Sequence, residues 1–164
     1  MDVLLAAKKV MFQVWRTAKI GTGLQAPGDF RKAMKQSGFQ ISDWANSILD
    51  KVMGANKEEE VELVKITNAE LGFPEGARVE DTYRRAKELS LKLCPQEVGL
   101  QLRLQYTDQP MGEWLLIGME PIRASDGYPR VFYVVRNEPG TWLSAAYGYP
   151  EYFWYGNTTW LFRK

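Results

Sequence analysis

The spacing of the apolar residues changes near Gly99, and this change limits the folds that are open to the chain. Before Gly99, apolar residues recur at intervals of three or four, which is the period of a helix that buries one side. After it, apolar and polar residues alternate from Leu100 to Tyr106, which is the period of a strand with one buried face. The sequence therefore predicts a helical first half and a strand-rich second half.

Helical spacing occurs in four segments, and glycines or capping residues mark several of their ends. Ser42 or Asp43 can cap the third helix, and Gly38 can end the second. The first helix is amphipathic, and it either packs on the sheet or forms an appended element. The predicted helices span residues 3–18, 29–36, 44–52 and 79–89.

Turn-forming combinations separate the predicted strands of the second half. Asp108–Gly112, Ser125–Pro129 and Asn137–Gly140 combine Gly or Pro with polar residues, and such short connections favour antiparallel hairpins. We therefore expect an α+β fold whose helical N-terminal half packs on one face of a four- to five-stranded antiparallel meander sheet in the C-terminal half. The predicted strands span residues 61–66, 100–106, 114–120, 131–136, 142–147 and 159–163.

The size of the chain indicates a single domain. Its 164 residues, 45% of them hydrophobic, are enough to bury a substantial core. Residues 54–60 are small and polar and end in consecutive glutamates, which predicts an exposed loop or linker. The prediction is one domain over residues 1–164, to which the helix of residues 1–18 could be appended.

The absence of histidine excludes several chemistries. With no histidine and with Cys94 as the single cysteine, the chain cannot form His-based triads, Cys–His dyads, cysteine-rich zinc sites or an internal disulfide. We expect no metal and no cofactor. Because no signal-peptide pattern or long apolar run occurs, we also expect a cytoplasmic chain without a membrane segment.

The charge is nearly balanced, with 21 basic and 20 acidic residues. A net charge of +1 provides no overall field for a polyanion. Nucleic-acid binding is therefore not favoured, although the basic excess of residues 1–57 keeps weak binding open as an alternative.

Paired carboxylates are the catalytic chemistry that remains without histidine. Glu113 and Glu120 are the candidates, and they could serve a hydrolase that acts on glycans. Their separation of seven residues would place them on opposite faces of a regular strand unless Gly118 forms a bulge. The alternative is that both simply mark the ends of a strand.

Aromatic residues are concentrated near the C-terminal end, with nine of them between Trp142 and Phe162. Residues 147–156 have turn residues at both ends and are predicted to form a loop. Its rings either tie the loop down as a hydrophobic cluster or form a platform for a ligand. The predicted ligand-binding residues are Tyr149, Tyr152, Trp154 and Tyr155.

Three stretches carry a resemblance to other proteins: Leu91–Gly99, Gln101–Tyr106 and Gly112–Pro121. They resemble a group of uncharacterised bacterial proteins, and the similarity extends from the segment Gly38–Leu49 onward. The resemblance implies a bacterial or phage origin and a self-standing domain, and it carries no activity, cofactor or catalytic residue.

The leading hypothesis from the sequence is a non-enzymatic interaction domain. It would bind a protein or a small ligand through the aromatic loop of residues 147–156 and the neighbouring strand edges. The glycan hydrolase and the weak nucleic-acid binder are the alternatives. The sequence does not indicate an oligomeric state.

Overall fold

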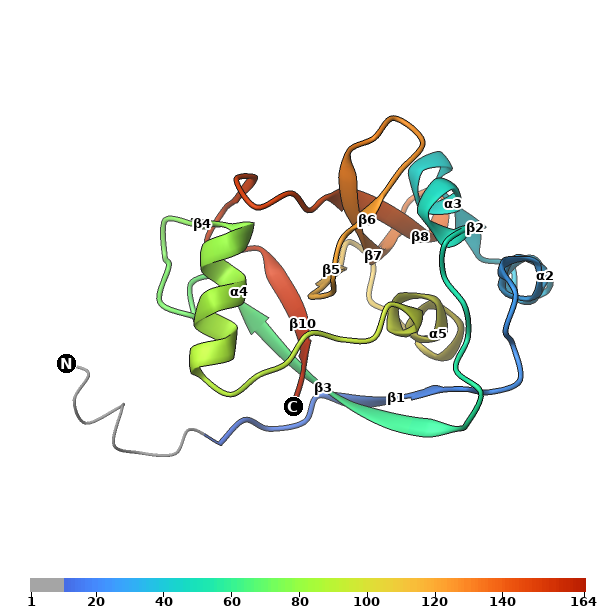
Figure 1. Cartoon of the computed structure of the whole chain (residues 1–164), viewed down its shortest axis with the longest axis horizontal. Helices are drawn as coiled ribbons and strands as arrows, with labels where there is room; N and C mark the ends of the chain where they lie inside the picture. The colour runs from blue at the N-terminus through green and yellow to red at the C-terminus, as the bar shows by residue number, and fades with distance from the viewer. Residues whose placement is uncertain (1–10) are drawn as a thin grey trace.

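The computed structural model describes residues 11–164 and shows a curved mixed sheet that forms a half-barrel around one helix (Figure 1). Seven strands follow one another in the order β1-β3-β10-β5-β7-β8-β2, and β6 also pairs with β7. A separate two-stranded sheet joins β4 and β9. The strands are β1 (Arg16–Ile20), β2 (Gln40–Ile41), β3 (Glu59–Thr67), β4 (Ala77–Arg78), β5 (Trp114–Ile117), β6 (Ile122–Arg123), β7 (Pro129–Asn137), β8 (Gly140–Tyr147), β9 (Phe153–Trp154) and β10 (Thr159–Arg163).

Two parallel pairs distinguish this sheet from a meander. Strand β10 runs parallel to β5, and β2 runs parallel to β8, whereas the other neighbouring strands are antiparallel. Strand β10 also pairs along its whole length with β3. It therefore joins the β1–β3 pair to the group formed by β5, β7 and β8.

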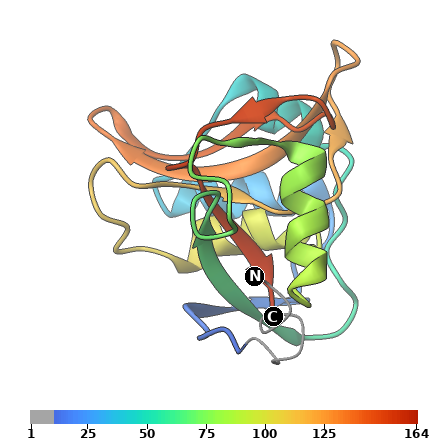
Figure 2. The ribbon, with the colours of Figure 1, turned by 90° about the vertical axis from the view of Figure 1, so that its left-hand side faces the viewer.

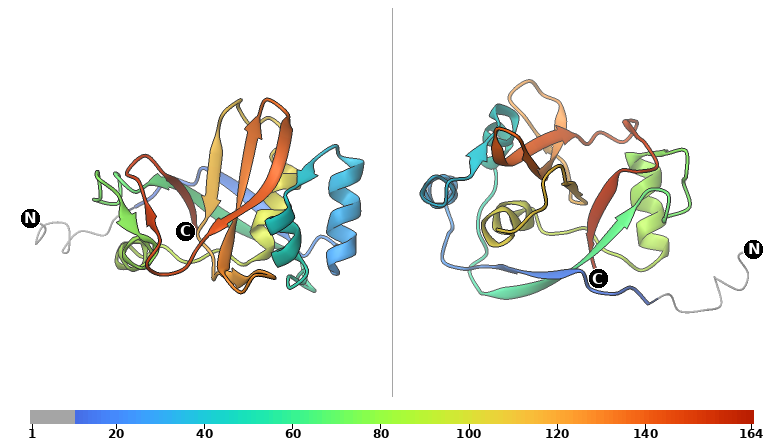
Figure 3. Two further views of the ribbon diagram at one scale, coloured as in Figure 1. Left: turned by 90° about the horizontal axis from the view of Figure 1, so that it is seen from above. Right: turned by 180° about the vertical axis from the view of Figure 1, so that it is seen from behind.

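Helices lie on both faces of the sheet. On the concave side α5 runs between β1, β7 and β8 (Figure 3), and a Cβ atom on its Gly99 would lie only 2.8 Å from Phe132. On the opposite face α4 stands against β10 (Figure 2), where the Tyr83 ring meets Trp160 and Phe162 edge to face. The helices are α2 (Pro27–Gln36), α3 (Asp43–Leu49), α4 (Val79–Glu88) and α5 (Glu97–Gln105).

The predicted architecture of a helical half on an antiparallel meander is wrong. The sheet is mixed, and three of its strands, β1, β2 and β3, come from the N-terminal half, where only β3 coincides with a predicted strand. The helices also cover two faces rather than one. The physical reason is that early segments of the chain close the curved sheet at both edges, with β1 at one edge and β2 at the other.

The helix predicted for residues 3–18 lies outside the described residues at positions 3–10 and is wrong for the rest. Residues 11–15 have no regular structure, and β1 begins at Arg16. Within β1, Ala18 and Ile20 are buried while Lys19 is exposed, which is the alternation of an edge strand with one buried face.

The strand predicted for residues 100–106 is also wrong, because this segment forms most of α5. Every residue from Glu97 to Arg103 is buried, including the polar Gln101. A helix that is enclosed on all sides has no polar face, so the alternation of Leu with Gln and Arg carries no information about which side is buried.

Most other predicted elements are confirmed. Helices α2 and α4 occupy the predicted segments, and α3 is confirmed but ends at Leu49, three residues early. The Ser42 side chain caps α3 by accepting the Ala45 backbone N–H. Strands β7, β8 and β10 are confirmed, while β5 ends at Ile117, three residues early. Strand β3 is longer than predicted and includes the last two residues of the predicted loop 54–60.

Candidate binding surface

Four tyrosines pack ring against ring at the surface where β8 leads into the loop of residues 147–156. We call Tyr128, Tyr147, Tyr149 and Tyr152 the tyrosine cluster. Their ring centroids lie 5.3 to 6.4 Å apart, and most of the contacts are edge to face. Contacts of this kind are the favoured geometry of aromatic pairs. The rings touch one another, so the cluster presents a continuous surface and not an open cage.

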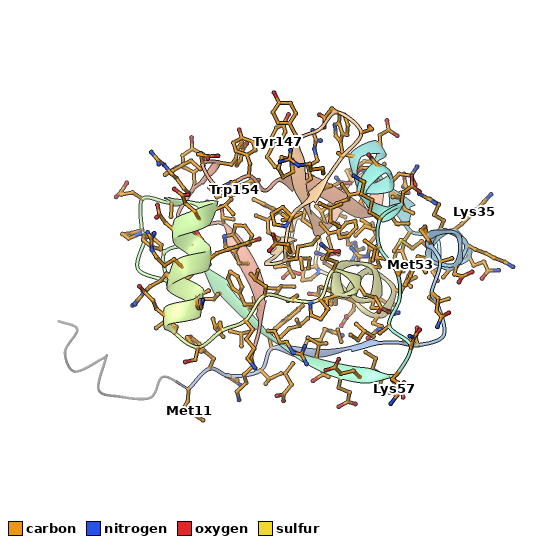
Figure 4. All side chains as sticks on the ribbon, in the orientation of Figure 1. Met11, Lys35, Met53, Lys57, Tyr147 and Trp154 are labelled. Carbon is orange, nitrogen blue, oxygen red and sulfur yellow. The ribbon has the colours of Figure 1, made fainter. Side chains whose placement is uncertain are left out.

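The cluster continues into a second group of rings. Tyr152 contacts Trp154 at 5.1 Å, Trp154 contacts Trp114 at 5.8 Å, and Trp114 contacts Tyr133 at 6.1 Å. Figure 4 shows the labelled Tyr147 and Trp154 on the same side of the molecule. Aromatic side chains from the β6–β7 turn, β5, β7, β8 and β9 thus form one stripe.

Parts of this stripe are open to solvent. Tyr128 is 54% exposed and Tyr147 and Trp114 are each 37% exposed, whereas the remaining members are partly buried. None of the seven rings of the stripe is among the buried residues of the core; they are Trp114, Tyr128, Tyr133, Tyr147, Tyr149, Tyr152 and Trp154. Burying such rings against a partner would remove further apolar area from water.

The fully buried Asn68 side chain forms hydrogen bonds with the backbone of the aromatic segment, residues 147–156. Its side-chain Nδ2 donates to the backbone carbonyls of Trp154 and Tyr155 at 3.2 and 3.1 Å, and its Oδ1 accepts the Thr82 hydroxyl at 2.9 Å. Because Thr82 belongs to α4, this one amide ties the loop to the helix. The loop backbone is therefore held in place by fixed partners.

Backbone bonds to the start of α4 hold the same loop a second time. The N–H groups of Val79 and Glu80 donate to the carbonyls of Tyr152 and Pro150 at 2.9 and 3.0 Å. These are N–H groups of the first helical turn, which have no partner within the helix itself. The loop thus caps α4, and the two bonds tie the loop backbone on which Tyr149 and Tyr152 lie to the start of the helix.

A buried cation supports the other end of the cluster. The Arg130 guanidinium lies 4.7 Å from the Tyr147 ring and 3.9 Å from the Trp44 ring, and it forms a two-pronged ion pair with Asp126 at 2.7 and 3.0 Å. Stacking of this kind stabilises both the cation and the rings. The hydrogen bonds from Arg130 lower the pKa of the Asp126 carboxyl below its usual range. Arg130 therefore fixes the orientation of Tyr147 and neutralises Asp126.

Two adjoining cavities lie beside the tyrosine cluster. The first, of about 410 Å³, is lined by Glu80, Tyr83, Glu120 and Pro121 among others, and the second, of about 560 Å³, by Asp126, Tyr128, Tyr149 and Glu151. Arg123, Pro129 and Pro150 line both cavities. We call the combined depression the proline groove. The tyrosine cluster contributes Tyr128 and Tyr149 to its wall, so cluster and groove form one surface.

The structure separates the four ligand-binding residues that the sequence predicted. Tyr149, Tyr152 and Trp154 lie together in the aromatic stripe. Tyr155 instead contacts Phe153, and it is 71% exposed. Side chains alternate along a strand, so the residues next to Trp154 in and beyond β9 point away from the stripe.

The two candidate catalytic carboxylates have different surroundings. Glu113 is largely buried, accepts the Tyr106 hydroxyl at 2.8 Å and pairs with Lys65 at 3.1 Å. Burial and this hydrogen bond to Glu113 raise the pKa of the Tyr106 hydroxyl. Glu120 lies beyond the other end of β5 and lines the proline groove. The pair considered from the sequence does not come together across β5, whereas Glu120 shares a cavity with Glu80.

Sequence reasoning missed several members of the surface. These members are far in sequence from residues 147–156: Tyr128 lies in the β6–β7 turn, Trp114 in β5, and Arg130 and Tyr133 in β7. The local density of aromatic residues could find only the part of the stripe that is continuous in sequence. The other rings reach it through the pairing of β5 with β7 and of β7 with β8.

Within residues 11–164 no group of three or more His, Cys, Asp or Glu side chains is arranged to hold a metal ion. In the same residues no helix has both the length and the apolar character needed to cross a membrane. In comparisons with known proteins, no family model, no curated protein and no solved structure matches the chain.

Proposed function

We propose that this chain is a non-enzymatic interaction domain that binds a partner through the tyrosine cluster and the proline groove. The observation that carries the proposal is the packing of four tyrosines at the surface, in mutual contact, beside a groove whose wall two of them form. Tyrosine is enriched where proteins bind one another, because it offers a large apolar area and a polar hydroxyl on a side chain with little rotational freedom.

The rigidity of the surface also supports binding. Asn68, the start of α4 and Arg130 each fix part of the aromatic stripe. A surface that is already ordered loses little conformational entropy when a partner docks, and this favours affinity. A tyrosine cluster needed only for the stability of the fold could be fully buried, whereas Tyr128 remains more than half exposed.

The experiment is a selection of linear peptides from a displayed random library on the immobilised full chain. The selected peptides are then tested against a Tyr128→Ala, Tyr149→Ala double variant. Loss of a central aromatic contact typically costs about 2 kcal/mol or more, so we expect peptide affinity to fall by at least about thirtyfold.

Tyr155→Ala is the matched control, because Tyr155 is the more exposed ring but lies outside the stripe. We expect this variant to bind the selected peptides as the unmodified chain does. A selection that enriches no peptide, or peptides that bind the double variant and the control equally well, would contradict the proposal. Circular dichroism of each variant establishes that the fold is retained.

A further inference from the structure

The charges around the proline groove are unequal. Among residues 11–164, four carboxylates line it, those of Glu80, Glu120, Asp126 and Glu151, against the single guanidinium of Arg123. Arg130 already neutralises Asp126. Arg123 donates to the Gly127 carbonyl at 2.7 Å, so part of its hydrogen-bonding capacity is used within the turn.

Two of the carboxylates have no cationic partner in the part of the chain that the structure describes. Glu120 and Glu151 are exposed and form no ion pair among residues 11–164, and they line the two different halves of the groove. Glu80 lies 3.8 Å from Arg78 in an exposed and long contact. Each of the two cavities that form the groove is therefore lined by a carboxylate without an ion pair in the described residues.

The walls between these carboxylates offer few hydrogen-bond donors. Pro121, Pro129 and Pro150 have no N–H group, and the N–H of Gly148 donates to the Pro129 carbonyl at 3.0 Å. The Tyr83 hydroxyl donates to the Met119 carbonyl at 2.8 Å and accepts the N–H of the same residue. Among the described residues that line the groove, the side-chain donors that remain are the Arg123 guanidinium and the hydroxyls of Tyr128 and Tyr149, and the four carboxylates outnumber this one cation. A ligand that combines an apolar chain with a positive charge therefore matches the groove better than an anion does.

We propose that the proline groove binds an extended segment of a partner protein that carries an arginine or lysine. The segment packs its apolar and proline side chains on Pro129, Pro150 and the neighbouring tyrosines. Its cation reaches Glu120 or Glu151. This inference rests on the proposed function, since it names the partner of the same surface.

The shape of the site supports an extended occupant. The two cavities adjoin through Arg123, Pro129 and Pro150, so the depression is longer than either cavity alone. Grooves lined by aromatic side chains, as this one is by Tyr128 and Tyr149, are surfaces on which extended, proline-containing segments dock, because such segments are nearly ordered before binding. The acidic side chains then select among such segments by charge.

The test uses peptides selected on the unmodified chain and resynthesised in matched forms. In each form one arginine, or a lysine first exchanged for arginine, is replaced by citrulline, which keeps the shape of arginine and removes its charge. Affinity is measured by fluorescence polarisation at low and moderate salt. We expect enrichment of arginine and lysine in the selected peptides, and a loss of about tenfold in affinity on replacement by citrulline, which equals about 1.4 kcal/mol.

A Glu120→Gln, Glu151→Gln double variant then assigns the charge to the groove. In this variant the citrulline and arginine peptides should bind with nearly equal affinity, while Glu138→Gln, an exposed change in the β7–β8 turn, should preserve the tenfold difference. Charge pairs between exposed groups weaken with salt, so the difference should also shrink at moderate salt.

The outcomes separate this inference from the proposed function. If peptides bind through the tyrosine cluster but show no preference for basic residues, or a preference for acidic ones, the inference is overturned and the interaction domain stands. If citrulline peptides remain weaker in the Glu120→Gln, Glu151→Gln variant, the cation binds elsewhere and the inference is likewise overturned. If no peptide binds, both proposals fall.

Discussion

Replacing Asn68 with alanine should loosen the aromatic segment and destabilise the whole domain. The change removes the two bonds to the Trp154 and Tyr155 carbonyls and the bond from the Thr82 hydroxyl. Each hydrogen bond contributes about 0.5–1.5 kcal/mol, and a buried group left without a partner costs about 1–3 kcal/mol. Because the three bonds share one side chain, their losses are not additive. We expect the free energy of unfolding to fall by about 2–4 kcal/mol.

The assay is urea unfolding followed by tryptophan fluorescence, together with hydrogen exchange of the backbone around residues 150–158. In a thermal melt, the melting temperature should fall by about 2–4 °C for each kcal/mol that is lost from the free energy of unfolding of a chain of this size. Asn157→Ala is the control, because Asn157 is exposed in the neighbouring turn between β9 and β10. Surface changes usually stay within about 0.5 kcal/mol. If Asn68→Ala costs no more than this control, the amide does not hold the loop and our account of the rigid surface is wrong.

Three further predictions concern other parts of the molecule. Gly21→Ala should destabilise the domain far more than Gly23→Ala. Both glycines have a positive φ, but only at Gly21 would the new Cβ atom lie 1.9 Å from a backbone carbonyl oxygen. Equal unfolding midpoints of the two variants in urea would contradict this. Burial raises the pKa of the Cys94 thiol to about 12, so the thiol should not react with a disulfide reagent at pH 8 until urea is added. The stability that comes from keeping this thiol protonated in the folded chain should be lost as the pH rises above about 9 toward 12. Fast labelling of the native chain would show that the thiol is not buried. Hydrogen bonds from Arg130 lower the pKa of Asp126 in the folded chain. The stabilisation from this carboxylate is therefore present above the pKa of Asp126 in the unfolded chain, and it is lost as the pH falls through the lower pKa of the folded chain. Asp126→Asn should make the melting temperature less dependent on pH in the acid range.

The sequence predicted the elements whose signals are local. Helix α3 has its cap in Ser42, α2 has its stop in Gly38, and the β7–β8 hairpin has its turn in Asn137–Gly140. Each of these signals lies within a few residues of the element that it limits, and each element is confirmed. Patterns of this kind do not depend on the rest of the fold.

Helix α5 could not be predicted because its partners are distant in sequence. The Glu97 carboxylate accepts the N–H groups of Gly21 and Ala55 at 3.0 and 2.7 Å. The buried Arg103 donates to the Trp142 carbonyl at 3.2 Å, 39 residues away along the chain. Polar residues can be buried only where such partners exist. Because the sequence does not show these partners, the alternation of Leu with Gln and Arg predicts a strand with one face exposed to solvent.

The candidate surface was predicted in part for the same reason. Tyr149, Tyr152 and Trp154 are close in sequence, so their density predicted that they gather. Tyr128 joins them through the β6–β7 turn and Trp114 through its pairing with β7. The groove depends on Pro129 and Pro150, which are 21 residues apart and meet where the Gly148 N–H donates to the Pro129 carbonyl. No local pattern indicates that meeting.

The position of β10 governs the order in which the chain can fold. It is the last strand along the chain, yet it lies between β3 and β5 and links two parts of the sheet that are otherwise not adjacent in the strand order. A ribosome must therefore complete the chain as far as Arg163 before the half-barrel can form. Until then β3 and β5 each lack a hydrogen-bonded neighbour on the side that β10 will occupy, and such open edges can pair with other chains. Contacts between segments this far apart in sequence form slowly, because closing a long loop costs entropy, so these two edges should stay unpaired for longer than the edges of a local hairpin.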